Sequence, residues 1–193
     1  KVLNSTQKKA YETIQVAIDG AEADNTILVS AGTFDEDITI KRSIKLFGAN
    51  AGINPNNTDW SLAERRPETV FTGFIKAEAG VENIEIDGFK FTKGANGEGG
   101  ALNFTLGGHT TIKIYNCIAE DTYANAEHRG SGFMYVTNHG PGGPRNGTVE
   151  FINNRLINTH GSNTAGTSGV LIWSTNNVIA NGNYFSRTDE ETG

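Results

Sequence analysis

The chain has 193 residues with 24 glycines, 4 prolines and one cysteine, and its formal net charge is -6 at pH 7. This acidic balance excludes the basic surface on which nucleic-acid binding depends, and no apolar run is long enough for a membrane-spanning helix. The single Cys117 excludes an internal disulfide and a cysteine metal cluster, so we interpret it as a small structural residue. The length suits one domain with its own core, and we expect residues 1–193 to form a single domain.

The N-terminal segment has the period of an amphipathic helix. Its apolar stripe consists of Tyr11, Ile14, Ala17, Ile18 and Ala21. Three side chains that can cap a helix precede the stripe, namely Asn4, Ser5 and Thr6. We therefore predict one helix over residues 5–22 that covers the strand edges and the apolar end of the first coil.

After residue 24 the apolar period changes from 3.6 to 2. Three short strands are predicted from alternating pairs, which are Ile27 and Val29, Ile38 and Ile40, and Ile44 and Leu46, with a turn over residues 31–34. Residues 49–68 break this pattern, because they are polar and contain Pro55 and Pro67. They are predicted to form a loop excursion anchored by Trp60 and Leu62, followed by a strand over residues 69–74.

Four stretches of the chain resemble one another, which is typical of a solenoid. Each has two alternating apolar positions, a Gly or Asn corner, a second apolar pair and a polar exit. They cover residues 81–92, 109–122, 146–159 and 175–188. Two inward ladders are predicted, Ile84/Ile112/Val149/Val178 and Ile86/Ile114/Phe151/Ala180. Gly88, Asn116, Asn153 and Gly182 occupy the corner, where left-handed backbone is expected.

A second recurrent strand lies between these stretches, as ALNFT from Ala101, FMYVT from Phe133 and VLIWS from Val170. Each coil therefore holds three short strands and three corners, and the corners on either side of this second strand vary in length. Stacked coils would pair strand on strand in parallel at about 4.8 Å. The alternative, a β-sandwich, would need two-residue hairpin turns, and none is convincing in this sequence.

The stretch YETIQVAIDG, the GTF-E-I-I run from Gly32 and the LFG that follows at Leu46 resemble the start of pectin lyase-like, right-handed parallel β-helix proteins. By motif the resemblance covers residues 11–52, and the later coils are similar in spacing only. The superfamily includes polysaccharide lyases, hydrolases, pectin esterases, phage tailspikes and bacterial surface proteins. Membership therefore does not select a function.

We predict an all-β fold, a right-handed parallel β-helix built as a three-sheet solenoid with an N-terminal α-helical cap. The cap spans residues 4–24, and the first coils span residues 25–75 with the excursion at residues 49–68. Regular coils span residues 76–193, and their C-terminal end is expected to be uncapped.

A polysaccharide lyase of this fold needs a base, often Arg or Lys, and a cation or Arg that neutralises a uronate carboxylate. Polar residues in the variable corners supply candidates. The candidate catalytic residues are Arg129, Arg145 and His139, and weak candidates for a Ca²⁺ site are Glu98, Asp121 and Glu127. Each also fits a plain interpretation as a solvated loop side chain, and no resident cofactor is predicted.

Two other enzyme classes fit less well. A glycoside hydrolase needs two carboxyl groups roughly 5–10 Å apart, and the polygalacturonase patterns appear only as fragments, such as Asn57-Thr58-Asp59 and His139-Gly140. The segments from Gly32 and Gly147 resemble pectin esterase motifs, with Glu150 where those enzymes carry Asp. The QDT and LGRPW segments of the esterases have no counterpart here.

The ALNF-type strands also predict a binding face. Asn103 and Tyr135, with Ile172, are expected to point outward, because an unpaired buried Asn would be costly; the opposite phase, with Leu102, Met134, Leu171 and Trp173 outward, stays open. An exposed Tyr among Asn, His and Arg side chains suits sugar stacking or a protein contact. The predicted glycan-binding residues are Asn103, Tyr135, His109, His128 and Trp173, with core packing as the alternative for Trp173.

We expect an extracellular or cell-surface structural or adhesive module rather than an enzyme. Its partner is predicted to be a glycan or a neighbouring protein subunit, bound through an open C-terminal coil, and a homo-oligomer is one form of this. The alternative is a polysaccharide lyase-like enzyme acting on an acidic glycan. A phage tailspike-type or carbohydrate esterase domain is a minor alternative.

Overall fold

The computed structural model describes residues 1–57, 65–93, 100–105, 110–124, 131–137, 147–159, 168–173 and 177–186. Within them the chain forms three sheets and one short helix, α1 (Ile14–Asp19). The fold is all-β, as predicted. No helix in these ranges is both long and apolar enough to cross a membrane.

The strands are divided among sheets A, B and C. Sheet A contains β1 (Val2–Asn4), β2 (Lys9–Tyr11), β3 (Asn25–Val29), β6 (Ile44–Phe47), β9 (Asn83–Asp87), β12 (Thr111–Tyr115), β15 (Thr148–Ile152) and β18 (Asn177–Asn181). Sheet B contains β4 (Gly32–Phe34), β7 (Thr69–Phe71), β10 (Phe89–Lys93), β13 (Ile118–Thr122), β16 (Arg155–Ile157) and β19 (Tyr184–Ser186). Sheet C contains β5 (Ile38–Ile40), β8 (Ile75–Ala77), β11 (Leu102–Thr105), β14 (Ser131–Thr137) and β17 (Ser168–Trp173).

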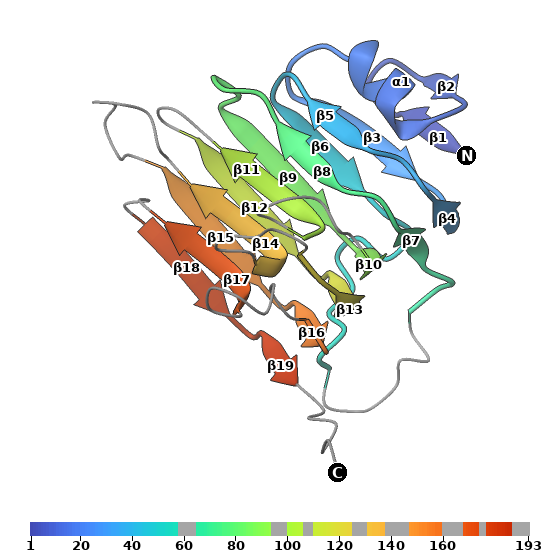
Figure 1. Cartoon of the computed structure of the whole chain (residues 1–193). Coiled ribbons are helices and arrows are strands. Elements are labelled where there is room, and N and C mark those ends of the chain that lie inside the picture. Colours follow the sequence, from blue (N-terminus) through green and yellow to red (C-terminus); the bar gives the residue numbers. More distant parts are fainter. Residues whose placement is uncertain are drawn as a thin grey trace.

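From β3 onward the chain passes through sheets A, B and C in turn, and each strand pairs in parallel with its counterpart one coil later. We number the coils from the N-terminal end: coil 1 is β3–β5, coil 2 is β6–β8, coil 3 is β9–β11, coil 4 is β12–β14, coil 5 is β15–β17, and β18 and β19 belong to coil 6. Figure 1 shows these coils stacked along one axis. The architecture is solenoid-like and compatible with a parallel β-helix.

Both predicted inward ladders of sheet A are confirmed. Ile84, Ile112, Val149 and Val178 pair in register, and so do Ile86, Ile114, Phe151 and Ala180. In coils 3 to 5 these side chains are at most 2% exposed. Sheets B and C contribute aromatic rings to the same core, and the Phe91 ring centroid lies 5.8 Å from that of Phe71 in sheet B and 5.3 Å from that of Phe133 in sheet C. Burying each such ring contributes about 1.5–3 kcal/mol, so these contacts hold successive coils together.

The corner between sheets A and B has the predicted backbone. Asn116 and Asn153 have φ angles of 51° and 57°, and Gly88 and Gly182 have φ angles of 73° and 65°. Glycine and asparagine tolerate this left-handed conformation better than other residues. The repeated Gly or Asn in the sequence therefore marks a repeated turn of the solenoid.

The predicted cap over residues 4–24, with one helix over residues 5–22, is not confirmed. The first eleven residues form β1 and β2, which are antiparallel to each other, and β1 adds antiparallel to β3. The helix begins only after Thr13, whose Oγ1 accepts a hydrogen bond from the Val16 N–H at 3.2 Å. The turn between β1 and β2 is supported by Asn4, whose Oδ1 accepts from the Gln7 N–H at 3.0 Å. A local Asn turn and a Thr N-cap thus divide a segment whose apolar spacing suited a longer helix.

Two smaller predictions about strands are also wrong. The expected turn over residues 31–34 contains β4, which pairs with β7. The strand expected over residues 69–74 ends at Phe71, and the separate strand β8 follows in sheet C. Strands of three residues carry too few alternating positions for the period to place their ends.

Candidate functional site

Most of the residues predicted to carry function lie outside the described residues. This applies to the candidate catalytic residues Arg129, Arg145 and His139, to the glycan-binding candidates His109 and His128, and to the Ca²⁺ candidates Glu98 and Glu127. The side chain of Trp173 also lies outside the described part, although its backbone belongs to β17. The lyase, esterase and glycan hypotheses at these residues stay predictions.

The outward ladder of sheet C differs from the predicted one. Asn103 pairs with Tyr135, and Tyr135 pairs with Leu171 instead of Ile172. A register shift between Ser131 and Met134 moves the third strand by one residue, which the sequence alignment of these strands could not show. Asn103 is half-buried, and Tyr135 is only 4% exposed. The expectation of an exposed tyrosine platform is therefore wrong.

Asp121 lies within β13, at a register shift against β10, and its φ angle is 52°. Its Oδ1 accepts a hydrogen bond from the Asn158 side-chain amide at 3.2 Å. In the part of the chain that the structure describes, no three His, Cys, Asp or Glu side chains gather as a metal site would require. The described surroundings of Asp121 are those of an irregularity in a strand.

Cys117 is fully buried at the corner of coil 4, as predicted for a structural residue. Burial is the main cause that raises the pKa of its thiol to about 12. A thiol with this pKa is protonated at neutral pH and is a poor nucleophile. Cys117 is therefore a packing residue.

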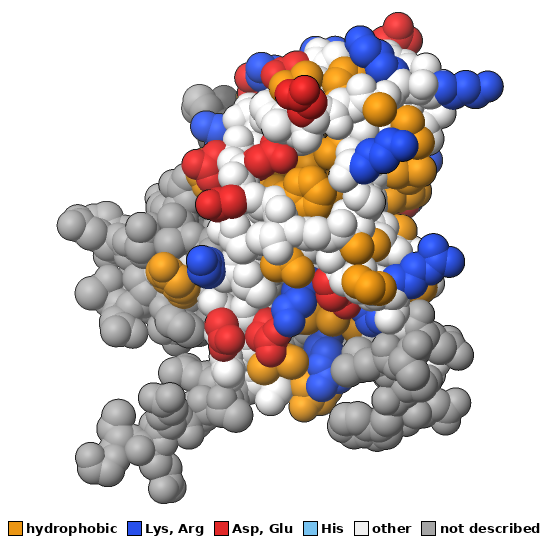
Figure 2. Space-filling view, turned by 90° about the vertical axis from the view of Figure 1, so that its right-hand side faces the viewer, with side chains coloured by type: hydrophobic (Ala, Val, Ile, Leu, Met, Phe, Trp, Pro, Cys, Tyr) orange, Lys and Arg blue, Asp and Glu red, His pale blue; other side chains and the backbone are white. Residues whose placement is uncertain are grey.

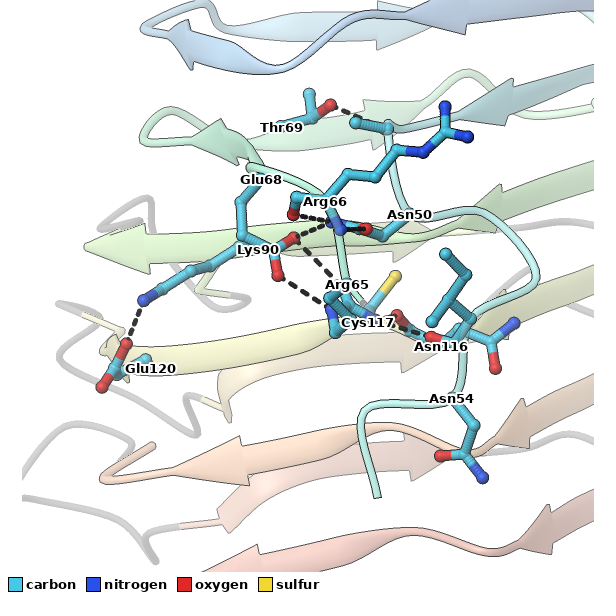
Figure 3. A network of polar contacts seen from close by, with 12 residues as sticks. Asn50, Asn54, Arg65, Arg66, Glu68, Thr69, Lys90, Asn116, Cys117 and Glu120 are labelled. Atoms are coloured by element: carbon cyan, nitrogen blue, oxygen red, sulfur yellow. Dashed lines mark hydrogen bonds and ion pairs between the residues drawn. The ribbon is translucent and has the colours of Figure 1, made fainter. Parts of the chain in front are cut away.

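The loop excursion contains a polar network that we call the strap, defined as residues 49–57 and 65–68. Arg65 is its centre, with a side chain that is only 3% exposed. Its guanidinium donates to both carboxylate oxygens of Glu68, at 2.8 and 3.0 Å, and to the carbonyls of Ile53 and Asn116, at 2.6 and 3.2 Å. Figure 3 shows Arg65 and Glu68 turned toward each other beside Asn116. Because these donors are used within the protein, we assign Arg65 a structural role instead of anion binding.

Asn50 completes this network from the other side of the strap. Its side-chain amide donates to Glu68 Oε2 at 2.8 Å and to the Arg66 carbonyl at 3.0 Å, and its Oδ1 accepts from the Arg66 N–H at 2.7 Å. Asn50 is fully buried. Asn50 thus joins residues 49–57 of the strap to residues 65–68, directly before β7 of coil 2.

The strap runs along the corners between sheets A and B and spans several coils (Figure 1). The Asn50 N–H donates to the Gly88 carbonyl in coil 3 at 3.3 Å. The Asn56 side-chain amide donates to the carbonyls of Asn154 in coil 5 and Gly182 in coil 6, both at 2.9 Å. A Cβ at Gly88 would lie 2.0 Å from the Ala51 nitrogen, so this close passage requires glycine.

Asp87 joins the strap to the solenoid and is 7% exposed. Its two carboxylate oxygens accept from the Gly52 N–H at 3.1 and 3.0 Å, and Oδ1 also accepts from the Asn116 side-chain amide at 2.8 Å. Burial raises the pKa of Asp87, and these hydrogen bonds together with the Arg65 charge only partly offset that cause.

Two asparagines, Asn154 in coil 5 and Asn183 in coil 6, stack on each other at the position directly after the left-handed corner residue. We call them the asparagine ladder. Asn154 is fully buried, and its Nδ2 donates to the Ile114 carbonyl at 2.8 Å while its Oδ1 accepts from the Cys117 N–H at 2.9 Å. The two asparagines are also joined directly, because Asn154 Nδ2 donates to Asn183 Oδ1 at 3.1 Å. The side chains thus bind the backbone of the preceding coil, as expected for corner asparagines.

The outward face of sheet A carries charges of alternating sign in successive coils. The paired positions are Lys45, Glu85, Lys113 and Glu150. Glu150 also accepts a hydrogen bond from the Tyr115 hydroxyl. Burial, followed by the neighbouring Glu150, raises the pKa of Tyr115, so this phenol is protonated at neutral pH. Figure 2 shows another side of the molecule, where acidic, basic and apolar side chains are also interspersed.

The apolar surface of the described residues gathers on coil 6. Seven large hydrophobic side chains are exposed in these parts of the chain, and four belong to β18 and β19. They are Val178 at 51%, Ile179 at 49%, Tyr184 at 45% and Phe185 at 59%. We call the end of the stack that β18 and β19 form the C-terminal face. The sequence predicts an uncapped, apolar end of the regular coils near Tyr184 and Phe185.

Comparison of the chain with protein-family models, with curated proteins and with solved structures found no match. The pectin lyase-like resemblance of residues 11–52 is therefore a prediction from sequence motifs.

Proposed function

We propose that the protein is an extracellular, non-catalytic assembly module, a right-handed parallel β-helix of the pectin lyase-like kind whose C-terminal face docks a further β-coil. The superfamily resemblance supports the handedness and the extracellular setting. One observation supports docking: equivalent core positions differ sharply between coils. Val149 and Leu156 in coil 5 are each 1% exposed, whereas their partners Val178 and Phe185 in coil 6 are 51% and 59% exposed.

The difference has a direct physical cause. In coils 3 to 5 each inward side chain is covered by the coil that follows, and the described residues place no coil over β18 and β19. Burying an apolar side chain of this size contributes about 1.5–3 kcal/mol, so covering Val178 and Phe185 favours association. Contiguous apolar side chains on an otherwise polar molecule mark interaction surfaces.

The backbone favours the same partner. β18 and β19 are the last strands of sheets A and B among the described residues, so each offers one unpaired backbone edge. An exposed edge of this kind pairs with another strand. A β-coil satisfies the edge and covers the apolar side chains at once, which a glycan would not do.

A coil peptide tests this function. The probe is a fluorescein-labelled peptide with the sequence of residues 147–157, GTVEFINNRLI, which carries one sheet A strand, the corner and one sheet B strand. We expect saturable binding to the full chain, measured by fluorescence anisotropy. The Phe185→Asp variant should bind at least about tenfold more weakly, because a charge would have to be buried at the docking surface.

The matched control is Val16→Asp. Val16 is also exposed, at 52%, but lies in α1 at the opposite end of the stack (Figure 1). This variant should bind the peptide as the wild type does, and circular dichroism checks that both variants are folded. Absence of peptide binding to the wild type, or equal binding by Phe185→Asp, would refute the proposed function.

A further inference from the structure

The asparagine ladder specifies the chemistry of the docking coil. We propose that this coil runs parallel to β18 and β19 and places an asparagine side chain against the Asn183 N–H and the Ala180 carbonyl. This inference rests on the proposed function and adds the orientation of the partner and one of its residues.

The ladder repeats the same pair of hydrogen bonds in two successive coils. Asn154 of coil 5 donates to the Ile114 carbonyl and accepts from the Cys117 N–H, both in coil 4. Asn183 of coil 6 donates to the Phe151 carbonyl at 2.6 Å and accepts from the Asn154 N–H at 2.8 Å, both in coil 5. Each asparagine therefore satisfies one carbonyl and one N–H of the coil before it.

The corresponding groups of coil 6 follow from the register. Ile114 pairs with Phe151, and Phe151 pairs with Ala180, so the Ala180 carbonyl is the next acceptor in the series. Asn183 follows Asn154 in the ladder, so the Asn183 N–H is the next donor. A docking coil buries both groups, and a buried backbone group without a partner is costly. An asparagine at this position satisfies both, whereas a leucine satisfies neither.

A second observation at the same corner favours a polar partner. The Asn56 side chain of the strap reaches the Gly182 carbonyl of coil 6 through its Nδ2. Its Oδ1 is buried and has no hydrogen-bond partner among the described residues. An unused acceptor beside the end of the asparagine ladder fits a docking coil that brings further donors to this corner.

Alternative occupants fit this pattern less well. At the N-terminal end, sheet A is bordered by β2, which runs in the same direction as β3 but is followed by α1 instead of a corner asparagine and a sheet B strand, so a second copy stacked end to end does not continue the ladder. Two C-terminal faces related by a two-fold axis would bring their strands together antiparallel. The partner is therefore a parallel coil with apolar residues at the ladder positions and asparagine at the corner.

The test compares variants of the peptide of residues 147–157 on the wild-type chain. Replacing the asparagine that corresponds to Asn154 by leucine should weaken binding at least about tenfold, because two backbone groups would be buried without partners. The control peptide carries Asn153→Gly and should bind unchanged, because Gly88 and Gly182 occupy the same left-handed position in other coils.

Two outcomes would overturn this inference. If the leucine peptide binds as tightly as the asparagine peptide, the ladder does not extend into the partner, although the docking function stands. If no peptide binds, the proposed function itself fails and this inference fails with it.

Discussion

Asp87 is the residue at which the strap, sheet A and the corner between sheets A and B meet. Its carboxylate accepts the Gly52 N–H from the strap and the Asn116 amide from coil 4. Burial nevertheless disfavours its charged form and raises its pKa. Within the pH window between the ordinary pKa of an aspartate and the raised pKa of Asp87, the native chain binds more protons at this site than the unfolded chain does. The contribution of Asp87 to stability therefore falls as the pH rises through that window.

Replacing Asp87 by Asn removes this titration and keeps one acceptor oxygen. We expect Asp87→Asn to be within about 1 kcal/mol of the wild type at pH 7, because the lost hydrogen bond is offset by the removal of a buried charge. As the pH is lowered from 7 to 4, the wild type should gain stability relative to the variant. Urea denaturation at several pH values measures this difference, with Glu85→Gln on the same strand as the charge control. A relative loss of stability by the wild type on acidification would contradict the assignment.

Predictions for single residues were confirmed where the backbone conformation alone determines which residue types fit. The Gly and Asn corners were predicted because few other residues adopt positive φ, and Cys117 was predicted because a small half-buried residue fits such a corner. Tyr135 was expected to be exposed and is buried, because alternation along a strand gives the side of the sheet and not what covers it.

The strap is the element whose contacts the sequence predicted least. Its Pro and polar residues predicted an excursion, but its hydrogen-bond partners lie up to 126 residues away in the chain. The pair formed by Arg65 and Glu68 has i,i+3 spacing, which occurs by chance in many polar loops. Local spacing therefore could not distinguish a fastened strap from a solvated loop.

Breaking the strap should be costly. Glu68→Ala leaves the Arg65 guanidinium, 3% exposed, without its carboxylate, and we expect a loss of about 3 kcal/mol in the free energy of unfolding. Asp19→Ala is the control, because Asp19 pairs with Lys41 on the surface, with exposures of 45% and 42%, and should lose less than about 1 kcal/mol. Urea denaturation of both variants measures the two losses. Equal losses would show that the strap does not stabilise the solenoid.

The N-terminal segment shows the limit of periodicity for short elements. Ile14, Ala17 and Ile18 are buried on one side of α1, as their spacing predicted. The helix has only six residues, and its surroundings decide where it begins: the N–H groups of Ile14 and Gln15 donate to the Glu36 carboxylate, both at 3.1 Å. Contacts of this kind between distant residues cannot be derived from an apolar stripe.

At the scale of the whole molecule, the sequence predicted the stacked architecture because the same apolar pattern recurs in every regular coil. Each recurrence predicted a pairing, and the registers from β9 to β18 confirm those pairings. The variable corners on either side of the sheet C strands carried most of the candidate catalytic residues, and a repeat pattern gives no position for such insertions. The candidate site is therefore the C-terminal face, where the repeated apolar positions of the coils are exposed.

The central claim is that the C-terminal face accepts a coil in the parallel register that already joins β15 to β18. In that register Thr148 pairs with Asn177, whereas an antiparallel partner would bring the position of Ile152 to Asn177. Disulfide cross-linking of an Asn177→Cys chain tests this directly with two peptides of residues 147–157, one with Cys at the Thr148 position and one with Cys at the Ile152 position. Native Cys117 is fully buried and does not compete. We predict preferential cross-linking to the Thr148 position; preference for the Ile152 position, or no cross-link to either, would contradict the claim.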